Sequence, residues 1–258
     1  MPSAFRRAFP TACFVWCLAW GIATAESEPE AKPQVAATPP PVAGMVDAEP
    51  GVVVELYTSQ GCAACPPADN LLARIAGRDG IIALSLHVDY WDYIGWRDRF
   101  AQPAFSKRQR AYARAEGSRS LFTPQMIVAG RHRLEGQRGM ELAELLQFEA
   151  ERPAQVEIEL HRNGAMLEIR ASAEPPLSLP VIVDLVRYRP REKVRIGAGE
   201  NAGRSVVYHN IVTVWETLGQ WDGTGPVTFH VRVEGPDAVV VLMQEEGPGP
   251  IVAAVQAR

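Results

Sequence analysis

Two cysteines separated by two alanines, Cys62 and Cys65, are the residues of this chain best suited to chemistry. An apolar, β-branched run at residues 52–57 precedes them, and a polar turn lies between that run and the first cysteine. Pro66 and Pro67 follow directly, and proline is favoured in the first turn of a helix. The pattern predicts a strand, a loop and a helix N-terminus, with both cysteines at the junction. Unpaired N–H groups and the helix dipole favour a thiolate there, as a redox dithiol requires.

The surrounding periodicity predicts the elements that hold this dithiol. Residues 66–76 have apolar side chains at helical spacing, and residues 81–88 are a second apolar strand pattern. A strand, a helix and a strand with short connections predict a right-handed unit with parallel strands. Further helices and strands are predicted at residues 103–116, 125–129, around Leu134 and at 140–150. The order β-α-β-α-β-β-α is that of the thioredoxin fold. We therefore predict an α/β domain over residues 51–152, a mixed sheet flanked by helices.

Beyond residue 153 the pattern changes to short alternating runs. Residues 156–160 and 166–171 alternate apolar and polar around Asn163-Gly164, which is a strong hairpin signal. Similar runs continue to the C-terminus between turns that contain Pro and Gly, and no helical period interrupts them. These features predict an all-β, sandwich-like domain over residues 153–258.

The N-terminal segment has the features of an export signal. Two arginines precede an apolar stretch at residues 12–22, and an A-x-A-like cleavage site ends at Ala25. Because this stretch is short for a membrane span, we predict a signal peptide at residues 1–25, with an uncleaved anchor as the alternative. Residues 26–50 are rich in Pro and Ala and predict a flexible linker.

The cysteine count agrees with an exported protein. Cys13 and Cys17 lie in the predicted signal peptide, so the mature protein would keep only the CxxC pair. Disulfides persist in oxidising compartments, and we expect a periplasmic or secreted bacterial protein with no membrane attachment after cleavage.

Composition and missing motifs exclude several function classes. The net charge of −4 and the pI of about 5.8 provide no basic field for nucleic acid. The glycines at residues 197–203 lack the G-x-G-x-x-G spacing and a following helix, which argues against a nucleotide site. No G-x-S-x-G is present, so a serine hydrolase has no support. We expect no cofactor, and the sequence does not predict an oligomeric state.

Several motifs give the chain a resemblance to known proteins. The CxxC after a strand, Thr123-Pro124 before a strand and Gly130 at a turn resemble the thioredoxin superfamily. Longer segments resemble an uncharacterised family of secreted bacterial proteins, catalogued as a domain of unknown function: ELYTSQGCAACPPAD, HVDYWDYIGW, RQRAYA, TPQMIVAG and GENAGR with YHN. The resemblance implies a thioredoxin-like fold and export, with no established substrate. Ordinary thioredoxins have a Trp before the first cysteine and Gly-Pro between the two. Both are absent here, so no redox potential can be carried over.

Position in the loop and the helix suggests roles for the two cysteines, and the resemblance implies roles for Thr123 and Pro124. Cys62 would be the exposed attacking thiolate and Cys65 the buried resolving thiol, and the oxidised form would hold a Cys62–Cys65 disulfide. Pro124 would be cis and face the dithiol, and the Thr123 backbone would pair with an incoming peptide. The alternative for Pro124 is an ordinary trans proline at the start of a strand. Partners would be protein thiols or disulfides.

Two other interpretations of the dithiol remain open. It could be a static structural disulfide in a non-enzymatic binding module. It could also capture a soft metal such as Cu(I), which two thiolates can hold without further ligands. A closed zinc site is not supported, because the sequence has no second CxxC and no suitably spaced His pair.

Four further residues are candidates for the site. Glu55, in the first strand, could have a raised pKa and relay the proton of the resolving thiol. The alternative is an outward carboxylate with a basic partner. Tyr90, Trp91 and Trp96 belong to an aromatic insert at residues 89–100, after a strand end that lies on the rim of the dithiol. We expect them to line a substrate groove, or alternatively to cover a core edge or the second domain.

Overall fold

A computed structural model describes residues 44–257 of the chain. The predicted signal peptide and most of the predicted linker lie outside the described residues. The last residues of that linker form two short strands, β1 (Gly44–Met45) and β2 (Ala48–Pro50), rather than the flexible tether we expected. Among the described helices, none has the length and apolar character that a membrane span requires.

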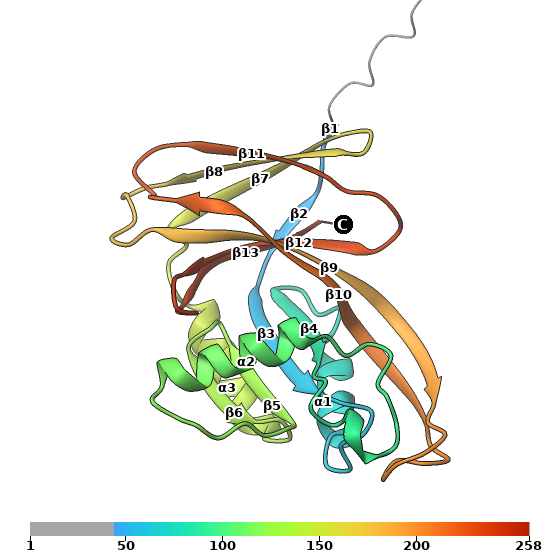
Figure 1. Ribbon diagram of the computed structural model, residues 1–258. Helices are drawn as coiled ribbons and strands as arrows, with labels where there is room; N and C mark the ends of the chain where they lie inside the picture. Colours follow the sequence, from blue (N-terminus) through green and yellow to red (C-terminus); the bar gives the residue numbers. More distant parts are fainter. Residues whose placement is uncertain (1–43, 258) are drawn as a thin grey trace, which may run out of the picture. The chain divides into compact units, whose positions relative to one another are not determined.

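The described residues contain more strands than helices (Figure 1). The helices are α1 (Pro66–Ile75), α2 (Pro103–Ala115) and α3 (Gly139–Ala150), with a short 3-10 helix η1 (Asp92–Ile94). The remaining strands are β3 (Val52–Thr58), β4 (Ile81–His87), β5 (Gln125–Val128), β6 (His132–Glu135), β7 (Val156–Asn163), β8 (Met166–Ala173), β9 (Val181–Arg195), β10 (Ser205–Trp221), β11 (Val227–Arg232), β12 (Ala238–Glu245) and β13 (Ile251–Ala257). The protein is thus a mixed α/β structure dominated by β-sheets.

One nine-stranded sheet runs through most of the described chain, in the order β2-β13-β12-β9-β10-β4-β3-β5-β6. Within it β3 and β4 are parallel, in register from Val52 with Ile81 to Thr58 with His87, and α1 connects them. This confirms the predicted strand–helix–strand unit. On the other side of β4 lies β10, also parallel to it, at Ile211 with Ser85. Strands from both predicted domains therefore share one sheet, and the described residues belong to one compact unit.

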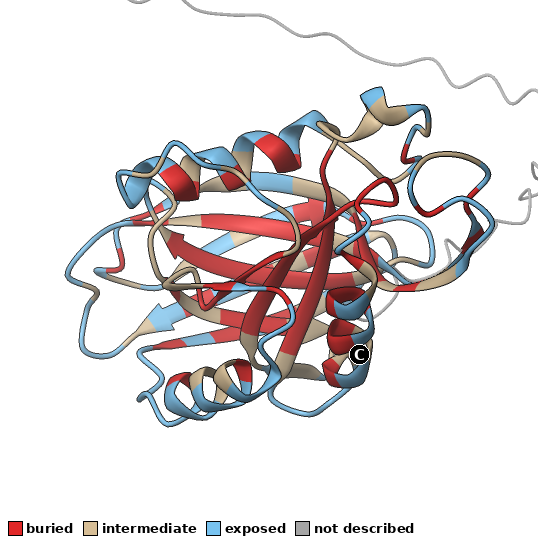
Figure 2. Ribbon diagram, turned by 90° about the horizontal axis from the view of Figure 1, so that it is seen from below, coloured by how far each residue is buried: buried red, intermediate tan, exposed pale blue. Residues whose placement is uncertain are grey.

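The two faces of β3 are covered by different elements, because successive side chains of a strand point to opposite faces. Val54 and Leu56 belong to the cluster that includes apolar residues of α1 and α3. Val53 and Tyr57 belong to the cluster that includes Phe105 of α2 and residues of the later strands. Figure 2 shows the central strands buried along their length and the helices buried on one side only.

A second sheet, of order β1-β7-β8-β11, packs against the large one. Its buried residues Leu160 and Ile169 share a cluster with Leu185, Val241 and Val255 of the large sheet. Burial of each such side chain contributes roughly 1.5–3 kcal/mol. The alternating runs predicted beyond residue 153 are therefore strands, but they do not form the separate sandwich that we expected, because β9, β10, β12 and β13 belong to the same sheet as β3 to β6.

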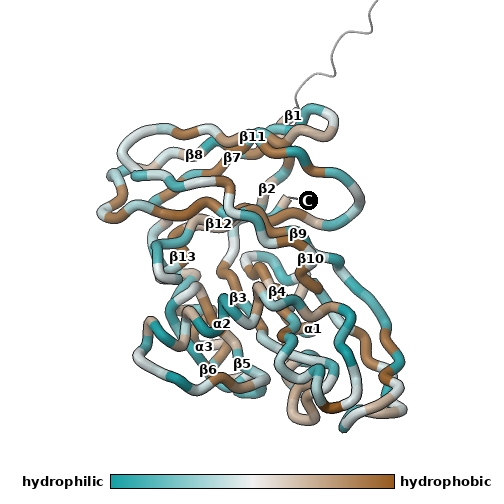
Figure 3. Tube along the Cα trace, viewed as in Figure 1, coloured by the Kyte–Doolittle hydropathy of each residue, from teal (hydrophilic) through white to brown (hydrophobic). Residues whose placement is uncertain are grey.

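The hairpin of β9 and β10 is much longer than its neighbours and extends past the sheet toward α1 (Figure 1). Hydrophilic and hydrophobic residues follow one another closely along it (Figure 3). Near its tip, Ile196 and Tyr208 are buried in a small cluster against Trp96 and Phe100 of the aromatic insert. The hairpin thus brings residues 196–204 to the helix that carries the cysteines.

Candidate functional site

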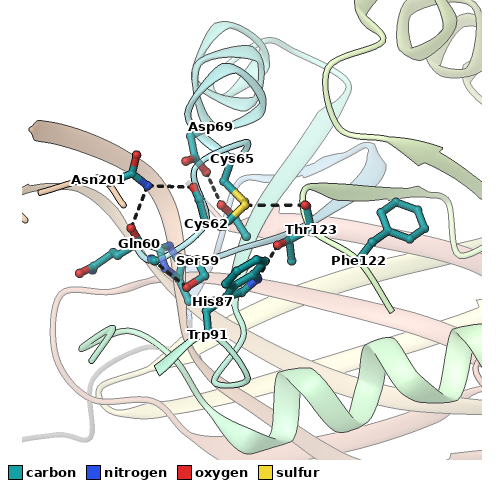
Figure 4. The surroundings of a disulfide bond; sticks show 12 residues. Ser59, Gln60, Cys62, Cys65, Asp69, His87, Trp91, Phe122, Thr123 and Asn201 are labelled. Carbon is teal, nitrogen blue, oxygen red and sulfur yellow. Dashed lines mark hydrogen bonds between the residues drawn. A yellow bond between two sulfur atoms is a disulfide. The ribbon is translucent and has the colours of Figure 1, made fainter. Parts of the chain in front are cut away.

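The cysteines of the CxxC segment form a disulfide at the N-terminus of α1 (Figure 4). Their Cα atoms are 5.4 Å apart, and Cys65 is the N-cap residue of the helix. Pro66 begins the helix, at a position where a missing N–H costs little. The N–H groups of Ala68 and Asp69 donate to the Cys65 carbonyl oxygen, at 2.9 and 3.1 Å. A Cys65 thiolate would therefore lie at the positive end of the helix dipole.

The loop before β5 lies against the disulfide. Its Thr123–Pro124 peptide bond is cis, as the resemblance implies. The Cys62 Sγ atom lies 3.7 Å from the Thr123 carbonyl oxygen. Gly136 makes this approach possible, because a Cβ atom there would stand 2.8 Å from the Pro124 Cβ atom and 2.9 Å from that of Ala68. The cis loop and α1 can pack this closely because residue 136 has no side chain.

The disulfide itself is buried. Cys62 is 1% exposed and Cys65 is 0% exposed, whereas Ala63 and Ala64 between them are exposed. The expectation of an exposed Cys62 is therefore wrong for this structure. The aromatic insert packs against the loop just before Cys62, because Ile94 and Trp91 side-chain atoms would stand 3.0 and 3.3 Å from a Cβ atom at Gly61.

The aromatic residues of the insert are tied to the loops around the disulfide. Trp91 Nε1 donates to the Thr123 hydroxyl at 2.7 Å, and Trp96 Nε1 donates to the Gln60 side-chain oxygen at 2.8 Å. The Tyr90 hydroxyl instead donates to Gln109 of α2 at 3.0 Å. Burial raises the pKa of Tyr90 to about 12. Trp91 and Trp96 therefore bind the loops on either side of the disulfide and lie next to the site.

The hairpin tip adds a residue that the sequence did not single out for this site. The Asn201 side-chain amide donates to the backbone oxygens of Gln60 and Cys62, at 3.0 and 2.8 Å (Figure 4). Gly197 allows the tip to approach, because a Cβ atom there would stand 2.9 Å from the Trp96 ring. The GENAGR motif contains Asn201 and was the available signal, but local pattern does not say that it reaches the cysteines.

Glu55 is buried, but on the face of β3 opposite α1. Arg108 of α2 binds both its carboxylate oxygens, each at 2.8 Å. The hydroxyls of Tyr57 and Tyr112 also donate to it, at 2.8 and 2.7 Å. Burial and the Glu55 charge raise the pKa of both tyrosines well above the usual range. Glu55 thus has the basic partner of the alternative interpretation, and its contacts are with the core rather than with the dithiol.

Asp69 is an acid on α1, the helix that has Cys65 as its N-cap residue, and it was not among the residues predicted for the site. Its side chain is buried, and its Oδ1 atom accepts a hydrogen bond from the Thr58 hydroxyl at 2.8 Å. Burial raises the pKa of Asp69 to about 7, against the opposing effects of His87 and of the Thr58 hydrogen bond. The spacing of four residues from Cys65 was the available signal, since it places both on one helix face.

A buried histidine–carboxylate pair lies behind the cysteine loop. Nδ1 of His87 is 2.6 Å from Oδ2 of Asp98, and both side chains are fully buried. The Gln60 N–H donates to the same oxygen at 2.8 Å. Burial alone would raise the pKa of Asp98, but the charge and hydrogen bond of His87 and two backbone N–H donors together lower it.

Among residues 44–257 no group of three or more His, Cys, Asp or Glu side chains is placed to hold a metal ion. Capture of a soft metal would therefore depend on the two thiols of the reduced pair. The structure provides a disulfide held by three loops, with a buried acid one helical turn away.

Comparisons with known proteins place the chain in a family. Residues 53–244 match the model of a family described as "Protein of unknown function (DUF1223)". The crystal structure of an Agrobacterium tumefaciens protein is similar with 31% identity and a TM-score of 0.68, covering 80% of this chain and 93% of that one. HBP35 of Porphyromonas gingivalis has 16% identity and a TM-score of 0.57, covering 81% of this chain and 74% of that one, and shows a likeness of fold alone. No curated protein matches the chain. From the match over residues 53–244, the chain belongs to the DUF1223 family of proteins of unknown function.

Proposed function

We propose that this protein is an exported, thioredoxin-like thiol–disulfide oxidoreductase that acts on protein thiols or disulfides through Cys62 and Cys65. The observation that carries the proposal is the Cys62–Cys65 disulfide at the N-terminus of α1, with Cys62 Sγ 3.7 Å from the Thr123 carbonyl oxygen. The parallel β3–α1–β4 unit followed by the antiparallel pair β5–β6 supports a thioredoxin-like arrangement. Export is supported by the leader pattern of the sequence.

The reaction is an exchange of two electrons between dithiols and disulfides. In the reducing direction, the Cys62 thiolate attacks a substrate disulfide, and a mixed disulfide forms as one substrate thiolate leaves. The Cys65 thiolate then attacks the Cys62 sulfur, which closes the Cys62–Cys65 disulfide and releases the second substrate thiol. In the oxidising direction a substrate thiolate attacks Cys62 and the same steps run in reverse. The redox potential of the pair against its compartment decides the direction.

Access to Cys62 requires movement, because its sulfur is covered in this structure. The aromatic insert and the hairpin tip are bound to the loops around the site by hydrogen bonds from Trp91, Trp96 and Asn201. A substrate that displaces part of the insert would reach both Cys62 and the Thr123–Pro124 loop. In the proposed function, the insert therefore determines which protein substrates reach Cys62.

The test is a redox titration of the purified protein in glutathione buffers, together with an insulin-reduction assay. We expect a two-electron transition and catalysed insulin reduction, both lost in Cys62→Ser. A disulfide that no thiol buffer reduces in the folded protein would overturn the proposal. N-terminal sequencing of the exported protein tests the proposed cleavage after Ala25, which lies outside the described residues.

Burial of both cysteines favours a second candidate function, a binding module with a structural disulfide. Closing so short a loop stabilises a protein by about 2 kcal/mol in the chain-entropy model. If the disulfide is structural, Cys62→Ser and Cys65→Ser should lower the free energy of unfolding by this same amount. The wild-type protein should then show no oxidoreductase activity. Metal analysis of protein purified under reducing conditions tests the copper alternative, which predicts stoichiometric metal that is lost in Cys65→Ser.

A further inference from the structure

The Asp69 carboxyl is buried one helical turn beyond Cys65 and has an incomplete set of partners. The side chain is 6% exposed. Its Oδ1 atom accepts the Thr58 hydrogen bond, while its buried Oδ2 atom has no hydrogen-bond partner among the described residues. Helical side chains lean toward the N-terminus, and residues four apart share a face, which directs the Asp69 carboxyl toward Cys65. Figure 4 draws both side chains at the N-terminal end of α1, where Cys65 is the N-cap residue.

We propose that Asp69 accepts the proton of Cys65 when the resolving thiol attacks, and returns it when Cys65 leaves, with the His87–Asp98 pair setting the charge around it. This inference rests on the proposed function and adds the proton-transfer group to it. An unpartnered carboxylate oxygen is costly to bury. A proton taken from the Cys65 thiol would neutralise Asp69 and remove the cost of burying that charge.

The proton and electrons balance in both directions. During resolution, the Cys65 S–H bond breaks and its proton passes to Oδ2 of Asp69. The Cys65 thiolate forms the S–S bond with Cys62, and the bond from Cys62 to the substrate sulfur breaks, so that the substrate leaves as a thiolate. When a substrate thiolate opens the disulfide instead, Cys65 leaves as a thiolate and takes its proton from the Asp69 carboxylic acid. The substrate disulfide or dithiol supplies or takes the two electrons.

The charged and polar groups that act on Asp69 come from several elements. Thr58 of β3 donates to it, His87 of β4 lowers its pKa, and Asp98 of the insert raises it. Tyr208 of β10 is also coupled to this carboxyl, because the charges of Asp69 and Asp98 add to burial in raising the pKa of that tyrosine. His87 itself is fixed by Asp98 and by ring contacts with Phe100 and Tyr208. Burial outweighs the effects that lower the pKa of Asp69 and brings it to about 7. A carboxyl group with this pKa can both accept and donate a proton near neutral pH.

The two chemical steps can be timed separately with a small chromogenic aromatic disulfide mixed with the reduced protein. Attack by Cys62 releases the first coloured thiolate, and closure by Cys65 releases the second. In the wild-type protein we expect the rate of the second phase to rise with pH and level off above about 7. In Asp69→Asn this phase should slow about tenfold or more at neutral pH. It should then keep rising toward the pKa of a free thiol, about 8.5. The first phase should be unchanged.

Two further variants make the test specific. Thr58→Val removes a hydrogen bond that lowers the pKa of Asp69, so the pH profile of the second phase should move to higher pH. This variant keeps the test available if Asp69→Asn folds poorly. Glu144→Gln, which removes an exposed carboxylate on α3, is the matched control and should leave both phases unchanged. If both phases occur but the second has the same pH profile in all variants, the role of Asp69 is overturned and the oxidoreductase stands. If the wild-type dithiol releases no coloured thiolate, both proposals fail.

Discussion

The Asn201 side-chain amide joins the tip of the β9–β10 hairpin to the cysteine loop by donating to the backbone oxygens of Gln60 and Cys62, at 3.0 and 2.8 Å. The two partners are 141 and 139 residues away in the chain. One amide group therefore fixes the loop that positions Cys62, and the hairpin belongs to the site as much as α1 does.

Replacing Asn201 should loosen this loop. In Asn201→Ala two carbonyl oxygens lose their donor in a buried place, so we expect the free energy of unfolding of the oxidised protein to fall by about 2–3 kcal/mol. Urea unfolding measures the loss. Asn70→Ala, on the exposed side of α1, is the control and should change it far less. Equal stability in the two variants would contradict the role of the amide.

Gly197 should tolerate no side chain. A Cβ atom there would stand 2.9 Å from the Trp96 ring, which itself donates to Gln60. We expect Gly197→Ala to lower the free energy of unfolding by about 1–3 kcal/mol, the usual cost of overpacking. Gly225→Ala is the matched control, because a Cβ atom at residue 225 meets nothing within 4 Å. A Gly197→Ala protein as stable as this control would show that the tip is not held against the insert.

The elements around the dithiol could be predicted because their signals are local. The apolar strands, the prolines that begin α1 and the short connections together predicted the parallel β3–β4 pair, which is confirmed. The long-range pairing of β10 with β4 left no such local signal. The sequence therefore assigned the later strands to a separate domain and left Asn201 without a partner.

The two acids near the cysteines in sequence, Glu55 and Asp69, were also only partly distinguishable from the sequence. Glu55 is close to the cysteines in sequence, but strand alternation puts it on the face of Val53 and Tyr57, with Arg108. Asp69 is four residues beyond Cys65 and on the same helix face. Periodicity could have separated the two acids, while the burial of Cys62 could not be predicted, because it depends on where the insert and the hairpin tip come to lie.

Glu55 should be a structural residue. Glu55→Gln leaves the Arg108 guanidinium, stacked 3.8 Å from the Trp215 ring centroid, without its carboxylate. We expect a loss of about 3–5 kcal/mol in the free energy of unfolding, as for other buried pairs. Glu116→Gln, which breaks the more exposed pair with Arg133, should lose at most about 1 kcal/mol. The pH profile of Cys65 closure should not move in either variant, and a shift in Glu55→Gln would contradict this assignment.

Trp91 should slow the reduction of the disulfide by holding the insert closed. Trp91→Phe keeps an aromatic ring, although a smaller one, and loses the 2.7 Å hydrogen bond to the Thr123 hydroxyl. A net hydrogen bond of about 1 kcal/mol corresponds to about a fivefold larger open population, and hence about fivefold faster reduction by dithiothreitol. Thr123→Val should have the same effect from the other side of the bond. Tyr93→Phe, at an 82% exposed residue of the insert, should leave the rate unchanged. Identical rates in all four proteins would show that the insert does not control access.

Asp69 should make the folded protein less stable as the pH rises. Its pKa is about 7 in the folded state against an ordinary value of 3.8, so between these values the folded state holds a proton that the unfolded chain has released. Stability is then greatest below pH 4 for this group and is lost progressively up to about pH 7, by roughly 4 kcal/mol in all. Asp69→Asn keeps an oxygen to accept the Thr58 hydrogen bond and has no charge to bury. We expect the variant to gain stability relative to the wild type as the pH is raised from 4 to 8, measured by urea unfolding of the oxidised proteins. Asp47→Asn, which removes an exposed carboxylate, controls for net charge. A difference between Asp69→Asn and wild type that stays constant across this range would mean that Asp69 does not exchange a proton near neutral pH.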